Sequence, residues 1–464
     1  MRGNAVSESP RPLEESPDEA LYRPIEQTGP GFYWAAAGLL AIFFFGAYQY
    51  LRQFSLGLGV TGMNQPVTWG FYIINFVFFI GISHAGTLIS AILRLNQAEW
   101  RRPITRMAEV ITAIVLLIGG LHPIIDLGRP DRALNIFMWG RLQSPLLWDV
   151  MSITAYLAAS TVYLYVPMIP DIAKLRDRGT RPRWLYEFLS WNWQGTPRQH
   201  QVLSRAMNLL MVLVIPVAVS VHTVISYIFA MTLEAGWHST IFGPYFVAGA
   251  IFSGIACLMV VMIVFRKVYH FEAYLKEVHF ANLAKLMLVM AVVWFYLTFS
   301  EYLTGFFGQE PAELDVIMYK FTGPYAFPFW LMVFLNFIVP VAILSRKRTR
   351  TIPWILVVSL GIVVGMWLER LIIVVPSLAV PYVPFPSHPY WPSLAEISIF
   401  AAAIAAFCLG FMAFAKFFPL ISIWEIEEGR ESAIRETSAR IASYLPDDPE
   451  PSASDEEAVP EGAK

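Results

Sequence analysis

Residues 105–149 read TRMAEVITAIVLLIGGLHPIIDLGRPDRALNIFMWGRLQSPLLWD, and this stretch decides the fold. It starts with an apolar run of about 20 residues, the length that an α-helix needs to cross the hydrocarbon core of a bilayer. A polar hairpin from His122 to Asp149 follows, and a second apolar run begins directly after it. Since backbone groups in lipid must find partners within their own segment, the pattern predicts two transmembrane helices joined by this hairpin.

Similar apolar runs recur along the whole chain. Its 464 residues are 56% hydrophobic and only 15% charged, and the mean hydropathy is +0.53. Soluble proteins carry closer to a quarter charged residues. The sequence therefore predicts an all-α integral membrane protein with about ten transmembrane helices. The predicted spans are residues 32–51, 68–93, 105–127, 146–169, 204–233, 241–266, 281–306, 328–345, 353–376 and 394–419.

The two ends of the chain differ in composition from this membrane domain, which is predicted to cover residues 32–420. Residues 1–31 are polar and rich in proline, and this composition predicts a disordered cytoplasmic tail. Residues 421–464 begin as a helical pattern and continue as an acidic tail. No charged segment followed by an apolar one precedes the first span, so we expect no cleaved signal peptide.

A weak internal repeat suggests how the spans are grouped. The second span opens with TWGFY at residues 68–72, and the sixth opens with IFGPYF at residues 241–246. Both spans run in the same direction across the membrane. Spans 2–5 (residues 68–233) and 6–9 (residues 241–376) are therefore predicted to form two four-helix bundles, with the first and last helices flanking them.

The placement of Lys and Arg predicts the orientation. These residues gather in alternate connections, namely 94–106, 174–205, 266–276 and 346–350. By the positive-inside rule these connections are cytoplasmic. Both termini are then cytoplasmic in a multi-pass protein of the cytoplasmic (inner) membrane, and the hairpin is periplasmic. The sequence has no basic patch interleaved with aromatic residues, so we expect no nucleic acid as a partner.

The hairpin carries the best candidates for chemistry. His122 and Asp126 are four residues apart and share a face if the helix continues past Pro123, and Asp149 begins the next span at the same depth. Ionisable groups at a bilayer boundary are rare without a function. A histidine and a carboxylate can each take a proton from one hydroxyl of a quinol. We therefore predict that His122, Asp126 and Asp149 line a quinol-oxidising site.

Several neighbours of these groups are predicted to contact the quinol. Arg129 and Arg141 are candidates for the head group, Trp69 and Trp148 for the ring, and His222 lies near the same side. The alternative for the arginines is a hydrated loop network with Asp131.

Further ionisable residues lie inside the spans and are predicted to form a proton path. They are His84, Glu109, Glu301, Glu369 and Arg370. Polar groups in transmembrane helices also tie helices together without any transport role, and this alternative stays open.

No metal or haem site is predicted in this chain. Cys257 and Cys408 lie in apolar runs. His84 and His222 lie on different helices at different estimated depths, which does not suit a haem with two histidine ligands. Electrons taken from a quinol would then leave to a partner. The aromatic, proline-rich loop PYVPFPSHPYWPS at residues 381–393 is suited to a docking surface.

Four stretches of the sequence resemble known membrane subunits. HPIIDLGRPDR (residues 122–132) and SPLLWDV (144–150) resemble the NrfD/PsrC family of quinone-interacting membrane subunits. FSEYLTGFFGQEPAEL (299–314) and GMWLERLIIVVPSL (365–378), with the ten-span layout, are similar to the ActC subunits of alternative complex III. The resemblance covers roughly residues 32–420.

The resemblance implies a menaquinol:acceptor oxidoreductase with menaquinol or menaquinone as substrate. It also implies a periplasmic iron–sulfur subunit, a multihaem cytochrome c subunit and a homologous ActF-like membrane subunit as partners, and proton movement through half-channels. Family members carry a histidine before LGRP where this chain has Asp126, so His122 could supply the imidazole here. Three alternatives stay open: a quinone-reducing subunit of a polysulfide-like reductase, a non-catalytic proton-translocating or scaffold subunit like ActF, and a secondary transporter.

Overall fold

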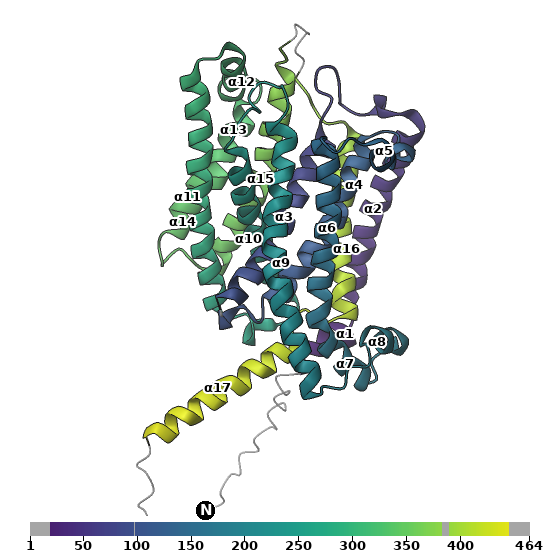
Figure 1. Cartoon of the computed structure of the whole chain (residues 1–464), viewed down its shortest axis with the longest axis vertical. Helices are drawn as coiled ribbons and strands as arrows, with labels where there is room; N and C mark the ends of the chain where they lie inside the picture. Colours follow the sequence, from purple (N-terminus) through teal and green to yellow (C-terminus); the bar gives the residue numbers. More distant parts are fainter. Residues whose placement is uncertain (1–18, 97, 383–388, 445–464) are drawn as a thin grey trace, which may run out of the picture.

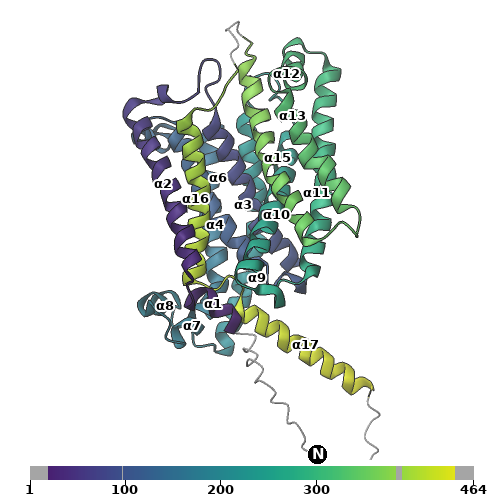
Figure 2. The same ribbon diagram turned by 180° about the vertical axis from the view of Figure 1, so that it is seen from behind.

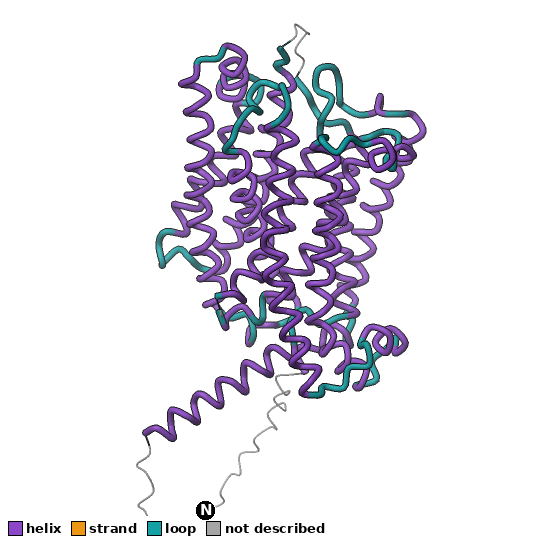
Figure 3. Tube along the Cα trace, viewed as in Figure 1, coloured by secondary structure: helices purple, strands orange, loops and turns teal. Residues whose placement is uncertain are grey.

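A computed structural model describes residues 19–96, 98–382 and 389–444 of the chain, and no strand occurs among them (Figures 1 and 3). Ten long apolar helical segments cross the molecule, which confirms the predicted all-α membrane fold. They are α2 (Pro30–Leu56), α3 (Phe71–Leu95), α4 (Thr105–Asp126), α6 (Pro145–Tyr165) continued by α7 (Ile169–Asp177), α9 (Pro197–Ala230), α10 (Phe242–Val268), α11 (Glu277–Gly308), α13 (Ala326–Val333) with α14 (Val339–Leu344), α15 (Ile352–Ala379) and α16 (Leu394–Phe417).

Shorter helices lie at the two ends of the molecule. They are α1 (Glu19–Glu26), α5 (Asn135–Trp139), α8 (Arg183–Leu189), α12 (Pro311–Phe321) and α17 (Ile423–Tyr444). Figures 1 and 2 show α1, α7, α8 and α17 at one end, which we call the α17 side. The connection between α4 and α6 lies at the other end with α5 and α12, and we call this the hairpin side.

The end of the predicted N-terminal tail is ordered. Residues 19–26 form α1, where the sequence predicts disorder, and Leu21 and Tyr22 of this helix are buried. The Lys416 ammonium donates hydrogen bonds of 2.6 Å to the carbonyl oxygens of Pro24 and Gln27 and so holds the α1–α2 connection against α16. Residues 1–18 and 445–464 of the two predicted tails lie outside the described residues.

Helix α3 is the centre of the membrane part. It packs against α4, α9, α10 and α15, and most of its described side chains are buried. Small residues allow the close approach to α4, since a Cβ on Gly86 would lie 1.8 Å from the carbonyl oxygen of Ala108. Polar side chains of α3 therefore face several neighbouring helices without access to lipid.

The first and last spans form a pair outside this centre. Figure 2 shows α2 and α16 side by side in front of α4. A Cβ on Gly46 of α2 would lie 2.3 Å from the Cβ of Ala402, so the two helices touch at the backbone. This pair covers the side of α4 that leads to His122 and Asp126.

Candidate functional site

The hairpin end of α4 holds a buried histidine with an unpartnered ring nitrogen within the described structure. His122 is 1% exposed, and its Nδ1 lies 2.9 Å from the carbonyl oxygen of Ile118. Because a carbonyl can only accept, Nδ1 carries the ring proton, and Nε2 of the neutral ring has a free lone pair. Nε2 is buried and has no hydrogen-bond partner among the described residues. The ring also packs against Phe79, with 5.3 Å between centroids.

Asp126 lies one turn beyond His122 on the same helix. The sequence analysis predicted that the two side chains share a face if the helix continues past Pro123. Helix α4 does continue through Pro123 to Asp126, so they share a face. Asp126 is half-buried, and its Oδ1 is buried without a hydrogen-bond partner among the described residues. A buried carboxylate oxygen without a hydrogen bond lowers the stability of the fold. Such a residue therefore usually binds a ligand or transfers a proton.

Asp149 approaches the same level from α6. It is 6% exposed, and its Oδ1 also has no partner among the described residues. Gly120 of α4 faces Ile153 of α6, because a Cβ on the glycine would lie 4.0 Å from the Ile153 Cγ2. The two helices are antiparallel. Four residues from the Gly120–Ile153 contact toward the hairpin side, Ile124 of α4 therefore lies at the level of Asp149 of α6. Asp149 therefore lies at a height between His122 and Asp126.

The first span adds two glutamines that the sequence analysis missed. The Gln53 Nε2 donates a 3.2 Å hydrogen bond to the carbonyl oxygen of Ile125, and the Tyr72 hydroxyl donates to the Gln53 Oε1. Gln49 lies one turn deeper on α2, is 5% exposed, and has an unpartnered Oε1 within the described structure. Two glutamines four residues apart in an apolar span were the available signal.

The last span adds a buried acid beside Asp126, also missed. The Glu396 Oε1 accepts a 2.5 Å hydrogen bond from the Tyr390 hydroxyl, and its Oε2 accepts from the backbone of Gly62 and Ser393, both at 2.7 Å. Glu396 lies near enough to Asp126 for the two carboxyl groups to repel each other. The α2–α16 pair thus forms a polar wall around the end of α4.

The predicted head-group contacts lie at the edge of this site. Arg129 and Asp131 pair with each other at 2.9 Å, and their side chains are 61% and 56% exposed. The hydrogen bond from Arg129 lowers the pKa of Asp131. Arg141 is also exposed. This placement agrees with the alternative of a hydrated loop network, and contact of either arginine with a quinol stays a prediction.

The two tryptophans are placed differently from each other. The Trp148 indole donates a 2.5 Å hydrogen bond to the carbonyl oxygen of Leu142 and remains 37% exposed, directly beside Asp149 in the chain. Trp69 stacks on Trp237 and lies edge-on to Phe229, with 6.0 Å between centroids in each pair. Trp69 therefore has an aromatic packing role at the start of α3.

His84 and His222 meet in the middle of the membrane part, which corrects the predicted difference in depth. Their ring centroids are 4.1 Å apart, and both side chains are fully buried. Side chains in a helix lean toward its N-terminus. Helices α3 and α9 are antiparallel, so the rings lean toward each other from different backbone levels, and a depth counted from span ends missed this. His222 therefore lies with the predicted proton-path residues.

The hydrogen bonds of these two rings differ. The His84 Nδ1 lies 2.9 Å from the carbonyl oxygen of Ile80, and its Nε2 lies 2.7 Å from that of Ala218. Neither nitrogen of His222 has a partner among the described residues. Two carbonyl oxygens can therefore accept hydrogen bonds from His84, whereas His222 has no hydrogen-bond partner among the described residues.

An ion pair follows on α15. Arg370 and Glu369 are 2.9 Å apart and buried, and the Trp294 indole donates a 2.6 Å hydrogen bond to Glu369. The Arg370 guanidinium lies 5.0 Å from the centroid of Phe246, whose ring is 6.3 Å from that of His222. The ion pair therefore connects the two histidines to α11.

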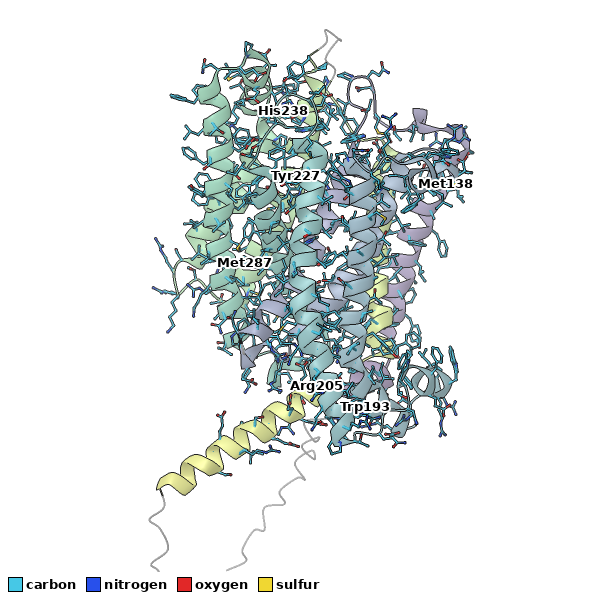
Figure 4. All side chains as sticks on the ribbon, in the orientation of Figure 1. Met138, Trp193, Arg205, Tyr227, His238 and Met287 are labelled. Carbon is cyan, nitrogen blue, oxygen red and sulfur yellow. The ribbon has the colours of Figure 1, made fainter. Side chains whose placement is uncertain are left out.

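A cavity lies between this ion pair and the hairpin side. Its volume is about 220 Å³, and Tyr245, Glu301, Tyr302 and Lys320 line it. Tyr245 lies close to Glu369, and Ser239 donates to Glu301. Burial lowers the pKa of Lys320 to about 8, although Glu301 opposes this shift. His238, labelled near this end in Figure 4, lines the same cavity.

Polar groups also continue from His84 toward the α17 side. The Tyr156 hydroxyl lies 2.9 Å from that of Thr87, and one turn further Ser90 donates a 2.7 Å hydrogen bond to Glu109. A cavity of about 530 Å³ lies beyond them, lined by Arg94 and Glu425. The groups predicted as a proton path are thus brought into one buried series between two cavities.

Glu425 closes this series with a clasp between α17 and the membrane helices. It accepts hydrogen bonds of 2.7 Å from Arg94 and 3.0 Å from Arg101. Burial works against the charged form, but the two arginines outweigh it and hold the pKa of Glu425 below its usual value of 4.5. A carboxylate with a lowered pKa stabilises the folded state above the unfolded pKa and loses this effect as the pH falls through the folded value.

We therefore expect the clasp to open in acid. Amide hydrogen-exchange protection of residues 426–438 should fall below about pH 4.5. Glu425→Gln should show the low protection already at pH 7. Glu431→Gln is the matched control, because Glu431 lies exposed on the same helix and pairs with Arg435 at 3.5 Å. Equal protection in Glu425→Gln and wild type would rule out the clasp.

No metal centre is formed by the part of the chain that the structure describes: no three His, Cys, Asp or Glu side chains are grouped to hold an ion. The candidate site is instead a set of proton-accepting groups at the hairpin end of α4 and α6, joined by the fold to a buried polar series.

Comparison with known proteins agrees with this architecture. The family model described as polysulphide reductase, NrfD, matches residues 59–382. A putative membrane subunit of dimethyl sulfoxide reductase from Halobacterium salinarum is 29% identical over 68% of this chain and 70% of its own length. An Hdr-like menaquinol oxidoreductase integral membrane subunit from Archaeoglobus fulgidus is 21% identical over 84% of this chain and 94% of its own.

A menaquinone reductase integral membrane subunit from Nitratidesulfovibrio vulgaris is 23% identical over 80% of this chain and 88% of its own length. These relatives are named as membrane subunits of oxidoreductases, and the family model covers most of the membrane domain. The chain therefore belongs to the polysulphide reductase NrfD family of multi-pass membrane proteins.

Proposed function

We propose that this chain is the quinol-oxidising membrane subunit of a quinol:acceptor oxidoreductase of the alternative complex III type. One observation carries the proposal: the His122 Nε2, the Asp126 Oδ1 and the Asp149 Oδ1 are buried at one end of α4 and α6 without a partner among the described residues. A quinol presents two hydroxyl donors, and these atoms are acceptors. The names of the relatives from Archaeoglobus and Nitratidesulfovibrio favour menaquinol as the substrate.

The reaction follows from these acceptors. One quinol hydroxyl donates to the His122 Nε2, and the other donates to the carboxylate of Asp126 or Asp149. If two electrons leave one at a time through an iron–sulfur cluster of a partner subunit, the two O–H bonds break and the protons pass to the ring nitrogen and the carboxylate. Quinol thus becomes quinone, two electrons leave through the partner, and two protons leave at the hairpin side.

The buried series suggests a second part of this function. We propose that protons cross between the two cavities through Glu301, the Glu369–Arg370 pair, the His84–His222 pair and Glu109. Ring contacts and hydrogen bonds join several of the successive groups, and Tyr245, which lines the hairpin-side cavity, lies close to Glu369. Movement of protons along this series would couple quinol oxidation to the membrane potential.

Orientation and partners complete the proposal. The basic connections place the α17 side and both termini in the cytoplasm, and the hairpin side faces the periplasm of an inner membrane. The iron–sulfur subunit would dock on the hairpin side and pass electrons to a multihaem cytochrome c subunit. A second, homologous ActF-like membrane subunit would share the bilayer.

Quinone reduction is the second candidate, because the Nitratidesulfovibrio relative is named a menaquinone reductase subunit. The same three acceptors would then deliver protons instead of receiving them. The partner subunits set the direction of electron flow. A purely structural role like that proposed for ActF would not require three unpaired buried acceptors.

Quinone retention tests the site in either direction. We expect menaquinone to be extracted from the purified complex, and we expect His122→Phe to weaken binding by about tenfold through loss of one hydrogen bond. His200→Phe is the control, because His200 is an exposed histidine on α9. If His122→Phe keeps the wild-type quinone content in an intact complex, the hairpin end of α4 is not the binding site.

A further inference from the structure

The largest apolar cavity among those described lies on the other side of the molecule from the proposed quinol site. Its volume is about 750 Å³, within the roughly 300–1,000 Å³ of typical ligand sites. Two walls are helices α10 and α16, and the third is the α1–α2 connection, which Figure 2 shows at the α17-side end of α16. Nothing in the proposed reaction uses this cavity.

The walls change from apolar to cationic along the membrane normal. Helices α10 and α16 both run from the hairpin side toward the α17 side. Val260 to Val268 and Phe407 to Met412 form the apolar part. Eight residues of helix span about 12 Å, close to the hydrocarbon depth of one leaflet, which is about 15 Å. Arg23, His270 and Lys416 line the end that faces the α17 side.

This cationic end is built by the fold and is not only a group of surface lysines and arginines. The Lys416 ammonium donates to the carbonyl oxygens of Pro24 and Gln27 at 2.6 Å and lies 5.0 Å from the Phe32 ring centroid. An ammonium has three hydrogens, so one remains for a ligand. Two carbonyl groups fix its position but do not neutralise its charge.

Among the described residues, the cavity offers no acidic partner for the Lys416 ammonium, because none of the lining residues in this part of the chain is acidic. Glu26 of α1 directly precedes Gln27, whose carbonyl oxygen contacts Lys416, but its carboxylate pairs with Arg178 at 2.9 Å. A ligand that fits must therefore have an anionic head at the level of Lys416 and an apolar tail of leaflet depth.

We propose that this cavity binds an anionic glycerophospholipid, with its phosphate at Arg23, His270 and Lys416 and an acyl chain along α10 and α16. A neutral quinone would fill the apolar part but would offer no negative charge to the Lys416 ammonium. The lipid would also hold α1 on the bundle, because the same lysine fixes the α1–α2 connection. This inference does not depend on the quinol chemistry.

Native mass spectrometry of the intact, delipidated complex tests the proposal. Phosphatidylglycerol and phosphatidylcholine with identical acyl chains are titrated into wild type, Arg23→Gln, Lys416→Gln and Lys416→Arg. We expect wild type to prefer phosphatidylglycerol, and each glutamine variant to lower this preference about fivefold, the effect of removing one cation near a lipid phosphate. Lys416→Arg keeps the charge and should keep the preference.

Lys285→Gln is the matched control, because Lys285 is an exposed lysine of α11 that does not line the cavity. Its preference should equal that of wild type. Equal binding of the two lipids to wild type would overturn the proposal, as would an unchanged preference in Arg23→Gln and Lys416→Gln. Displacement of the lipid by millimolar inorganic phosphate, or recovery of quinone from this cavity, would also overturn it.

Discussion

Asp149→Asn is expected to lower quinol oxidation by about 10²–10⁴-fold, the usual contribution of one positioned acid–base group. The amide keeps the shape of the side chain but cannot accept the proton that leaves the quinol. Since the Asp149 Oδ1 has no protein partner among the described residues, no hydrogen bond known to hold the fold is lost. The rate is measured on the purified complex with a reduced quinol and a soluble electron acceptor.

The hairpin provides a control for this substitution. Asp131→Asn changes the same chemical group elsewhere in the hairpin, but Asp131 is exposed and paired with Arg129. It should leave the rate at the wild-type value. A wild-type rate in Asp149→Asn, with the complex intact by size-exclusion chromatography, would remove Asp149 from the reaction and leave His122 and Asp126 as the acceptors.

Glu369→Gln is expected to abolish proton translocation while quinol oxidation continues. A glutamine oxygen can still accept the hydrogen bond that Trp294 donates at 2.6 Å, but the charge pairing with Arg370 at 2.9 Å is lost, so assembly of the complex is checked alongside. The amide cannot take up and release a proton, so the proposed route between Glu301 and the His84–His222 pair is interrupted at this position. In sealed vesicles, the number of protons moved per electron should fall to the number released by the quinol alone.

The comparison for this variant is Glu277→Gln. Glu277 lies at the start of α11, the helix that carries Trp294, and it is exposed. Its proton-to-electron ratio should match wild type. An unchanged ratio in Glu369→Gln would exclude the buried series as the route and leave the ion pair as a tie between α15 and its neighbours.

The sequence predicts the spans well because their lengths and apolar composition are local properties. All ten predicted spans correspond to the long apolar helices, with ends that differ by a few residues in most cases. The larger differences are at α7, which continues the fourth span to Asp177, and at α9, which begins at Pro197 after a capping box at Thr196. Polar helical ends of this kind carry no hydropathy signal.

Relations between helices were harder to predict. His122, Asp126 and Asp149 lie close together in the sequence, and their common level follows from one hairpin. Gln49 and Glu396 come from opposite ends of the chain, and only the packing of α2 on α16 brings them to this site. The contact of His84 with His222 depends on the lean of two side chains, which no count of residues from a span end includes.

The two carbonyl acceptors of His84 limit what this histidine pair can hold. A neutral ring has one N–H, so one of the two carbonyl contacts must lack its hydrogen; only the doubly protonated ring satisfies both. A second positive charge on His222, 4.1 Å away, would be strongly repelled in so dry a place. If protons pass through this pair as proposed, the pair holds one extra proton at a time, and that proton must leave before the next can enter.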